Sequence, residues 1–102
     1  MVVHMVLGKP REGLGEAEQG ELTGGFDSLR SIPGVMELTW GLDFSGRGDG
    51  YTFGAVVHFA DREALQRYLT HPDHLLVVNV LNRVMVKRLV LDYETATSGI
   101  SI

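Results

Sequence analysis

The sequence contains no cysteine among its 102 residues, which excludes disulfides, thiol nucleophiles and thiolate metal sites. It also lacks an excess of positive charge, because 13 acidic residues outnumber 9 lysines and arginines and the formal net charge is −4. Nucleic acids and anionic membranes bind basic faces, so we expect neither as a partner. No apolar run approaches the roughly 20 residues that span a bilayer.

The start of the chain also lacks the features of a signal peptide. Residues 1–7 are apolar, but they have no basic beginning and are too short for the apolar segment of such a peptide, so we expect a cytoplasmic protein. The length predicts one small domain over residues 1–94, followed by a flexible tail at residues 95–102. A domain of this size buries only about two-thirds of the surface that its unfolded chain exposes. Association with a second copy would therefore stabilise it.

Hydrophobic periodicity predicts four strands and two helical segments. Strands are predicted over residues 2–7, 35–44, 51–59 and 86–93. Residues 16–29 have helical spacing, although three glycines weaken this helix by about 1 kcal/mol each. The second segment begins after Asp61, whose carboxylate can cap it, and it is broken at Pro72, a residue that suits the first turn of a new helix. Residues 75–85 are rich in valine, yet their length and polar residues favour a helix over a strand.

The element order β-α-β-β-α-β is the split ferredoxin-like pattern, an α+β fold with an antiparallel four-stranded sheet and helices on one face. Apolar residues occupy both sides of the strands, as in residues 2–7 and 86–93, where only His4 is polar on the first strand. A large bare apolar face is unusual in a monomer. We therefore expect a twofold homodimer in which the second copy covers this face. In the second strand, the core-facing set is predicted to be Met36, Leu38, Trp40 and Leu42.

Several groups able to move a proton crowd into one short stretch of the sequence. Tyr68, His71 and His74 lie within seven residues and flank Pro72. A histidine can serve as a general base near neutral pH, and a tyrosine hydroxyl can stabilise the oxyanion of an enolate. An aldol closure needs both groups. The structural alternative is that His74 caps a helix and Tyr68 belongs to the core, and we expect His71 to be structural because Pro72 restrains its backbone.

This stretch and its surroundings resemble the stress-responsive α/β-barrel (Dabb) domain family over residues 2–94. The matching positions are His4, Ile32, Pro33, Gly34, Val35, Trp40, Gly41, Tyr51, residues 68–74, Asp92 and Tyr93. The resemblance implies a homodimer whose two sheets form a dimeric α+β barrel. It also implies kinship with polyketide cyclases that close a linear polyketide by an aldol reaction without a cofactor.

The resemblance further implies which residues form a site between the helices and the sheet. In such a cyclase, a tyrosine and a histidine at the positions of Tyr68 and His74 transfer the protons, and a histidine at the position of His4 lines the pocket. A second pocket histidine is replaced by Phe53, and an aromatic residue of the first helix falls near Gly25, so we expect a different substrate. The expected lining for an apolar, ketone-containing ligand is His4, Val6, Gly25, Phe26, Leu38, Phe53, Ala55, His71 and Val77.

Four alternatives accompany this interpretation. The first is a non-catalytic ligand-binding or stress-response dimer. The second is a small monooxygenase on a similar barrel with Trp40 in its pocket, although nothing marks oxygen chemistry. A metal site at His71, Asp73 and His74 matches no zinc spacing, and the glycine-rich residues 46–50 join two strands, which indicates a flexible hairpin loop instead of a phosphate site. We expect no metal and no cofactor. Asp92 and Tyr93 are predicted to make dimer contacts, and His58 is predicted to be unrelated to the site.

Overall fold

The computed structural model describes residues 1–95; of the predicted tail, residues 96–102 lie outside this range. The strands are β1 (Val2–Pro10), β2 (Glu37–Leu42), β3 (Phe53–Phe59) and β4 (Met85–Glu94). The helices are α1 (Glu16–Ser28), the short 3-10 turn η1 (Leu29–Ser31), α2 (Arg62–Leu69) and α3 (Pro72–Val84). The predicted β-α-β-β-α-β order is confirmed, including the division of the second helical segment into two.

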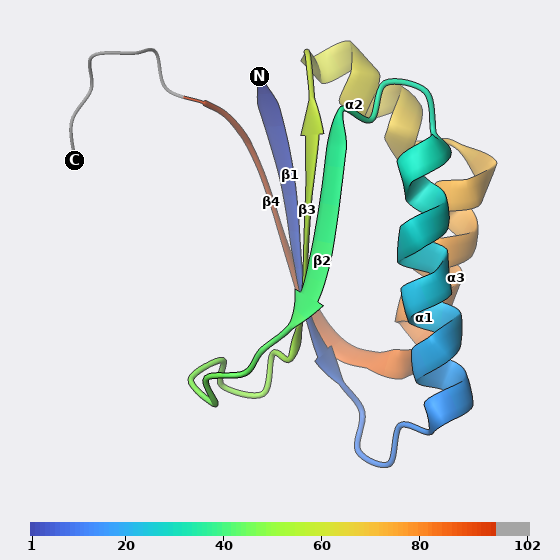
Figure 1. The fold of residues 1–102 in the computed structure, drawn as a ribbon, viewed down its shortest axis with the longest axis vertical. Coiled ribbons are helices and arrows are strands. Elements are labelled where there is room, and N and C mark those ends of the chain that lie inside the picture. The colour runs from blue at the N-terminus through green and yellow to red at the C-terminus, as the bar shows by residue number, and fades with distance from the viewer. Residues whose placement is uncertain (96–102) are drawn as a thin grey trace.

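The four strands form one sheet with the order β2-β3-β1-β4, in which every neighbouring pair is antiparallel. This is the predicted ferredoxin-like arrangement. The three helices lie together on one side of the sheet, and no helix of residues 1–95 lies on the other side (Figure 1). Within residues 1–95, no helix is both long enough and apolar enough to cross a membrane.

Local capping explains where α2 and α3 begin. The Asp61 carboxylate accepts a hydrogen bond from the Ala64 N–H at 2.9 Å, as predicted for the cap of α2. His71 caps α3 in the same way, because its Nδ1 accepts from the Asp73 N–H at 3.1 Å. Pro72 then occupies the first turn, where a missing N–H costs nothing. The valine-rich stretch is helical, and it buries Val77, Val80, Leu81 and Val84 at helical spacing.

The strand β3 alternates as predicted and contributes four buried side chains to the helix-covered face: Phe53, Ala55, Val57 and Phe59. The prediction for β2 needs a correction. Leu38 is buried and Trp40 is half-buried, but Met36 and Leu42 are 59% and 48% exposed. β2 is one of the two edge strands and begins only at Glu37, so Met36 lies just before the strand and Leu42 lies at its last paired position.

The bare side of the sheet carries a row of apolar residues on the two neighbouring strands β1 and β4. Three cross-strand pairs form this open face: Val3 with Tyr93, Met5 with Leu91, and Leu7 with Leu89. Leu89, Leu91 and Tyr93 are 54%, 59% and 43% exposed. On β1 itself, Val3 is buried and Leu7 is 38% exposed, so most of the exposed apolar surface of the open face belongs to β4.

Candidate active site between the helices and the sheet

Three ionisable rings from three different elements meet between the helices and the sheet. His4 comes from β1, Tyr68 from the last turn of α2, and His74 from the first turn of α3. The Tyr68 and His74 ring centroids are 4.5 Å apart, and His4 lies 5.7 Å from Tyr68 and 6.5 Å from His74. The break at Pro72 thus allows residues six positions apart in sequence to face one another.

The rings line a small cavity of about 20 Å³. Its lining is His4, Val6, Phe26, Leu29, Leu38, Ala55, Val57, Tyr68, His74, Val77 and Leu81. A cavity of this volume holds about one water molecule, whereas pockets for small organic ligands measure roughly 300–1,000 Å³. A larger ligand at this cavity must therefore displace side chains or approach its rings from an exposed edge.

The hydrogen bonding of His74 determines which of its nitrogens can act as a base. His74 Nδ1 lies 3.1 Å from the carbonyl oxygen of Leu69. A carbonyl only accepts, so Nδ1 carries the proton and Nε2 keeps a free lone pair. Burial lowers the pKa of His74; the Leu69 hydrogen bond opposes this shift, and the charges of His4 and Arg88 add to it. The imidazole is consequently neutral, and competent as a base, at neutral pH.

The Tyr68 hydroxyl beside His74 can donate a hydrogen bond. Tyr68 is only 2% exposed, and burial raises the pKa of its phenol, so the hydroxyl keeps its proton. Its ring packs edge-on against Phe59, with centroids 5.0 Å apart. Among the described residues, no fully enclosed side-chain oxygen or nitrogen lacks a partner. The Tyr68 hydroxyl has no hydrogen-bond partner among these residues, so it is not fully enclosed. It is therefore free to donate a hydrogen bond to a ligand.

Asp92, for which the sequence predicts dimer contacts, contacts the site within the single chain. β1 and β4 are paired so that His4 lies directly opposite Asp92, and the Asp92 carboxylate is hydrogen-bonded to His4 Nδ1. The His4 side chain is 5% exposed and the Asp92 side chain 39%. The carboxylate therefore fixes the orientation of a buried ring and connects it to the edge of the sheet. The sequence pattern predicts that the first and last strands are antiparallel neighbours. It does not give the register between them, which is what pairs His4 with Asp92.

Three residues predicted to line the site do not reach the cavity. Gly25 faces Val77 at the contact between α1 and α3, where an added Cβ would lie 3.1 Å from Val77 Cγ2. Phe53 is buried at the first position of β3, where it pairs with Gly8 of β1 and Leu42 of β2. His71 caps α3, in agreement with its predicted structural role. The cavity-lining residues that sequence reasoning missed are Leu29, Val57 and Leu81, apolar side chains that periodicity cannot distinguish from ordinary core.

Trp40 and His58 lie away from the cavity. Trp40 donates a hydrogen bond from Nε1 to Asp27 at 3.0 Å and does not line the cavity. His58 lies on the open side of the sheet, with Nδ1 3.3 Å from Glu37 Oε2, as expected for a residue unrelated to the site. Among residues 1–95, no group of three or more histidine or acidic side chains could hold a metal ion.

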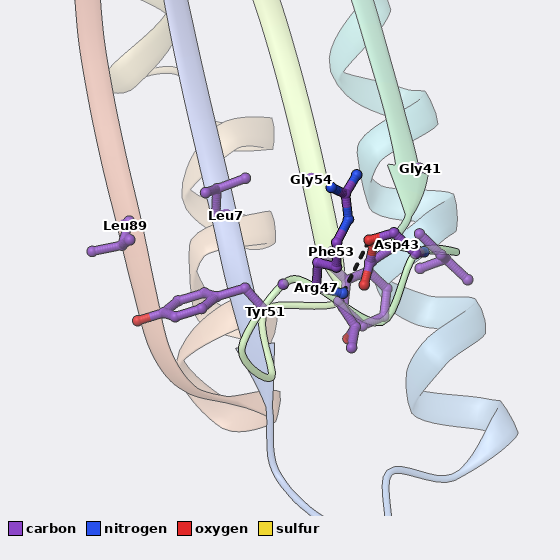
Figure 2. A pocket seen from close by; sticks show the side chains of 12 residues that line it. Leu7, Gly41, Asp43, Arg47, Tyr51, Phe53, Gly54 and Leu89 are labelled. Atoms are coloured by element: carbon purple, nitrogen blue, oxygen red, sulfur yellow. Dashed lines mark hydrogen bonds between the residues drawn. The ribbon is translucent and has the colours of Figure 1, made fainter.

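A larger hollow of about 820 Å³ lies at one end of the open side of the sheet. Figure 2 shows Leu7 and Leu89 on neighbouring strands beside Tyr51 and Arg47 of the β2–β3 connection. Asp43 closes that connection by accepting hydrogen bonds from the backbone N–H groups of Ser45 and Gly46 at 3.0 and 3.1 Å. The glycine-rich segment is therefore a hairpin connection, as predicted, and this hollow contains none of the three clustered rings.

Comparison with known proteins places the chain in a family. The model of the stress-responsive A/B barrel domain, Dabb, matches residues 2–95. The chain belongs to the stress-responsive A/B barrel domain family. It is 30% identical over 95 residues to olivetolic acid cyclase of Cannabis sativa, with 90% of this chain and 94% of that protein covered.

Two further proteins are similar to the chain. The chain is 29% identical over 96 residues to the stress-response A/B barrel domain-containing protein HS1 of Arabidopsis thaliana, with 91% of this chain and 88% of that protein covered. It is also 28% identical to a dimeric ferredoxin-like protein of unknown function from Jannaschia sp. CCS1. The crystal structure of that protein matches this fold with a TM-score of 0.76, and the match covers 92% of this chain and 98% of that chain. The predicted family membership is thus confirmed.

The partial burial of His74 gives a testable pH dependence. The pKa of His74 is lowered in the folded protein, so the unfolded chain binds more protons as the pH falls below about 6.5. The free energy of unfolding should therefore decrease as the pH falls from about 7 through this window, and His74→Gln should remove this contribution. NMR titration of the imidazole C–H signals should place the His74 midpoint below 6.5, and a midpoint above that value would contradict the assigned environment.

Proposed function

We propose that this Dabb protein is a homodimeric, cofactor-free enzyme that binds an apolar, ketone-containing small molecule and catalyses a proton-transfer step such as an aldol-type cyclisation. One observation carries the proposal: the rings of Tyr68 and His74 lie 4.5 Å apart at one cavity, with a neutral imidazole and a protonated phenol. The similarity to olivetolic acid cyclase supports it. The differences at Phe53 and Gly25 favour a substrate other than that of the relative.

The proposed reaction uses the two groups in sequence. His74 Nε2 removes a proton from the carbon next to a ketone, and the C–H electron pair moves into an enolate whose oxygen accepts a hydrogen bond from the Tyr68 hydroxyl. The enolate carbon attacks a second carbonyl of the same molecule, which forms a C–C bond and an alkoxide. The alkoxide takes the proton from the imidazolium and regenerates the neutral base. The His4 ring, oriented by Asp92, forms a polar wall beside this chemistry.

The homodimer in this proposal follows from the open face. Leu89 and Leu91 are more than half exposed on a continuous apolar surface, and a second copy of the same surface is the simplest cover. The similar Jannaschia protein is a dimer, which supports the same assembly here. Two sheets packed through their open faces would form the closed α+β barrel expected from the sequence.

A second candidate function is a non-catalytic ligand-binding or stress-response dimer. The cavity at the three rings holds about one water molecule. This volume favours the second candidate, because a substrate would fit only after side chains move. The similarity to the stress-response protein HS1 is compatible with either function.

A turnover assay separates the two candidates. A panel of linear di-, tri- and tetraketide mimics with differing alkyl ends is incubated with wild type and with His74→Ala, and cyclic products are quantified by liquid chromatography and mass spectrometry against the protein-free reaction. We expect wild type to exceed the spontaneous rate for at least one chain length and His74→Ala to fall close to it. Equal rates with both proteins, or no acceleration across the panel, would favour the non-catalytic dimer.

A further inference from the structure

The strand β4 presents three residues on the helix side of the sheet that no helix covers. The register pairs Arg88 with Gly8, Val90 with Val6, and Asp92 with His4. Because Val6 and His4 line the cavity, these β4 residues share the face of the sheet on which the rings lie. Yet Val90 is 53% exposed, and Arg88 and Asp92 are exposed as well. We call Arg88, Val90 and Asp92 the β4 strip.

β4 is an edge strand of the sheet and pairs with β1. The β4 strip therefore lies beside the two β1 residues that line the cavity, His4 and Val6. Its one apolar side chain, Val90, is exposed to solvent in the single chain.

The charges along the β4 strip have a direction. Asp92, at one end, is hydrogen-bonded to His4, whereas Arg88, at the other end, forms no ion pair with any residue in the described range 1–95. Residues four apart in a strand are separated by about 13 Å, with Val90 midway. Arg88 is nevertheless close enough for its charge to lower the pKa of His74. The strip thus places one exposed apolar side chain, Val90, between the cation of Arg88 and the end that lies beside the ring cluster.

We propose that the β4 strip is the specificity site of this protein and that Arg88 binds the carboxylate of an apolar, ketone-containing acid. The guanidinium can hold a carboxylate through two parallel hydrogen bonds. The carbon chain then lies along Val90 and brings its ketone toward His74. Repulsion by Asp92 disfavours the reversed orientation, so the substrate binds in one direction. The role of the ketone end rests on the proposed function, whereas the role of Arg88 in binding acids does not.

The test compares two probes of equal shape and different charge, octanoate and octanamide. Their dissociation constants are measured at neutral pH by ¹H–¹⁵N NMR titration of the full chain, using the backbone signals of Val90 and the ring signals of His74. For wild type, octanoate should bind about tenfold more tightly than octanamide. Arg88→Gln should weaken octanoate binding by about tenfold and change octanamide binding by less than twofold.

Lys87→Gln is the matched control, because it removes the same charge from the adjacent residue, which points to the other side of the sheet opposite Lys9. It should change both affinities by less than twofold. Arg88→Lys keeps the charge but loses the paired hydrogen bonds, and it should weaken octanoate binding by roughly threefold. Should Arg88→Gln not fold, Arg88→Lys carries the comparison. Equal losses in the Lys87 and Arg88 variants, or octanoate binding that leaves Val90 and His74 unperturbed, would overturn the inference.

These outcomes separate this inference from the proposed function, because the titration needs no turnover. Octanoate binding that depends on Arg88, in a protein that cyclises nothing, would uphold the inference and count against the enzyme. Turnover that depends on His74, with octanoate affinity unchanged by Arg88→Gln, would uphold the enzyme and overturn the inference.

Discussion

Replacing His74 by alanine is expected to lower the rate of ketone cyclisation by about 10²–10⁴-fold, the range that a positioned general base contributes. The expectation follows from the hydrogen bond between Nδ1 and the Leu69 carbonyl, which leaves Nε2 as the only basic atom of the ring. Tyr68→Phe should cost roughly 10²–10³-fold, as expected when one oxyanion donor is lost. The rate constant for cyclisation of the best ketone of the panel is the quantity to compare.

His71→Asn is the matched control for the loss of an imidazole from this segment. His71 lies three residues before His74 and caps α3, and asparagine can keep the cap because it is among the preferred N-cap residues. The variant should retain activity within about threefold of wild type. Circular dichroism and thermal unfolding would verify that the folds agree. Retained activity in His74→Ala, or equal losses in His71→Asn and His74→Ala, would contradict the assignment of His74 as the base.

Replacing Leu91 by lysine is expected to convert the dimer into monomers. Leu91 lies at the middle of the open face and is 59% exposed in the single chain. In a twofold dimer each substitution places two ammonium groups in one apolar interface, and burying an unpaired charge is strongly unfavourable. We expect the dissociation constant of the dimer to increase by roughly a hundredfold or more, measured by size-exclusion chromatography with light scattering over a range of concentrations.

Leu76→Lys makes the same chemical change at a leucine that is 64% exposed on α3, on the other side of the molecule. It should leave the dimer intact. A monomeric wild-type protein, or a Leu91→Lys variant that remains dimeric at the same concentrations, would argue against assembly through the open face. Dissociation by Leu76→Lys alone would place the interface on the helices instead.

Much of the fold was predictable from local sequence because its signals are local. The alternation in residues 53–59 determines which side chains of β3 enter the core, and Asp61 and Pro72 mark helix starts through hydrogen bonds and backbone restraints that span only a few residues. The same break predicted that Tyr68 and His74 meet, since both lie within one turn of Pro72. The ends of β2 were not predictable, because exposure at an edge strand depends on how far the helix layer extends over it.

The sequence by itself determined the order of the elements, the apolar open face and the proximity of Tyr68 and His74, all of which follow from residue types at short spacing. Only the tertiary structure decided that Asp92 supports His4, that Gly25, Phe53 and His71 stay away from the cavity, and that the cavity holds about one water molecule. These features depend on the register between β1 and β4, 88 residues apart at His4 and Asp92, and on how side chains from separate elements fill shared space. Patterns within a few residues of sequence determine neither the strand register nor the packing between elements.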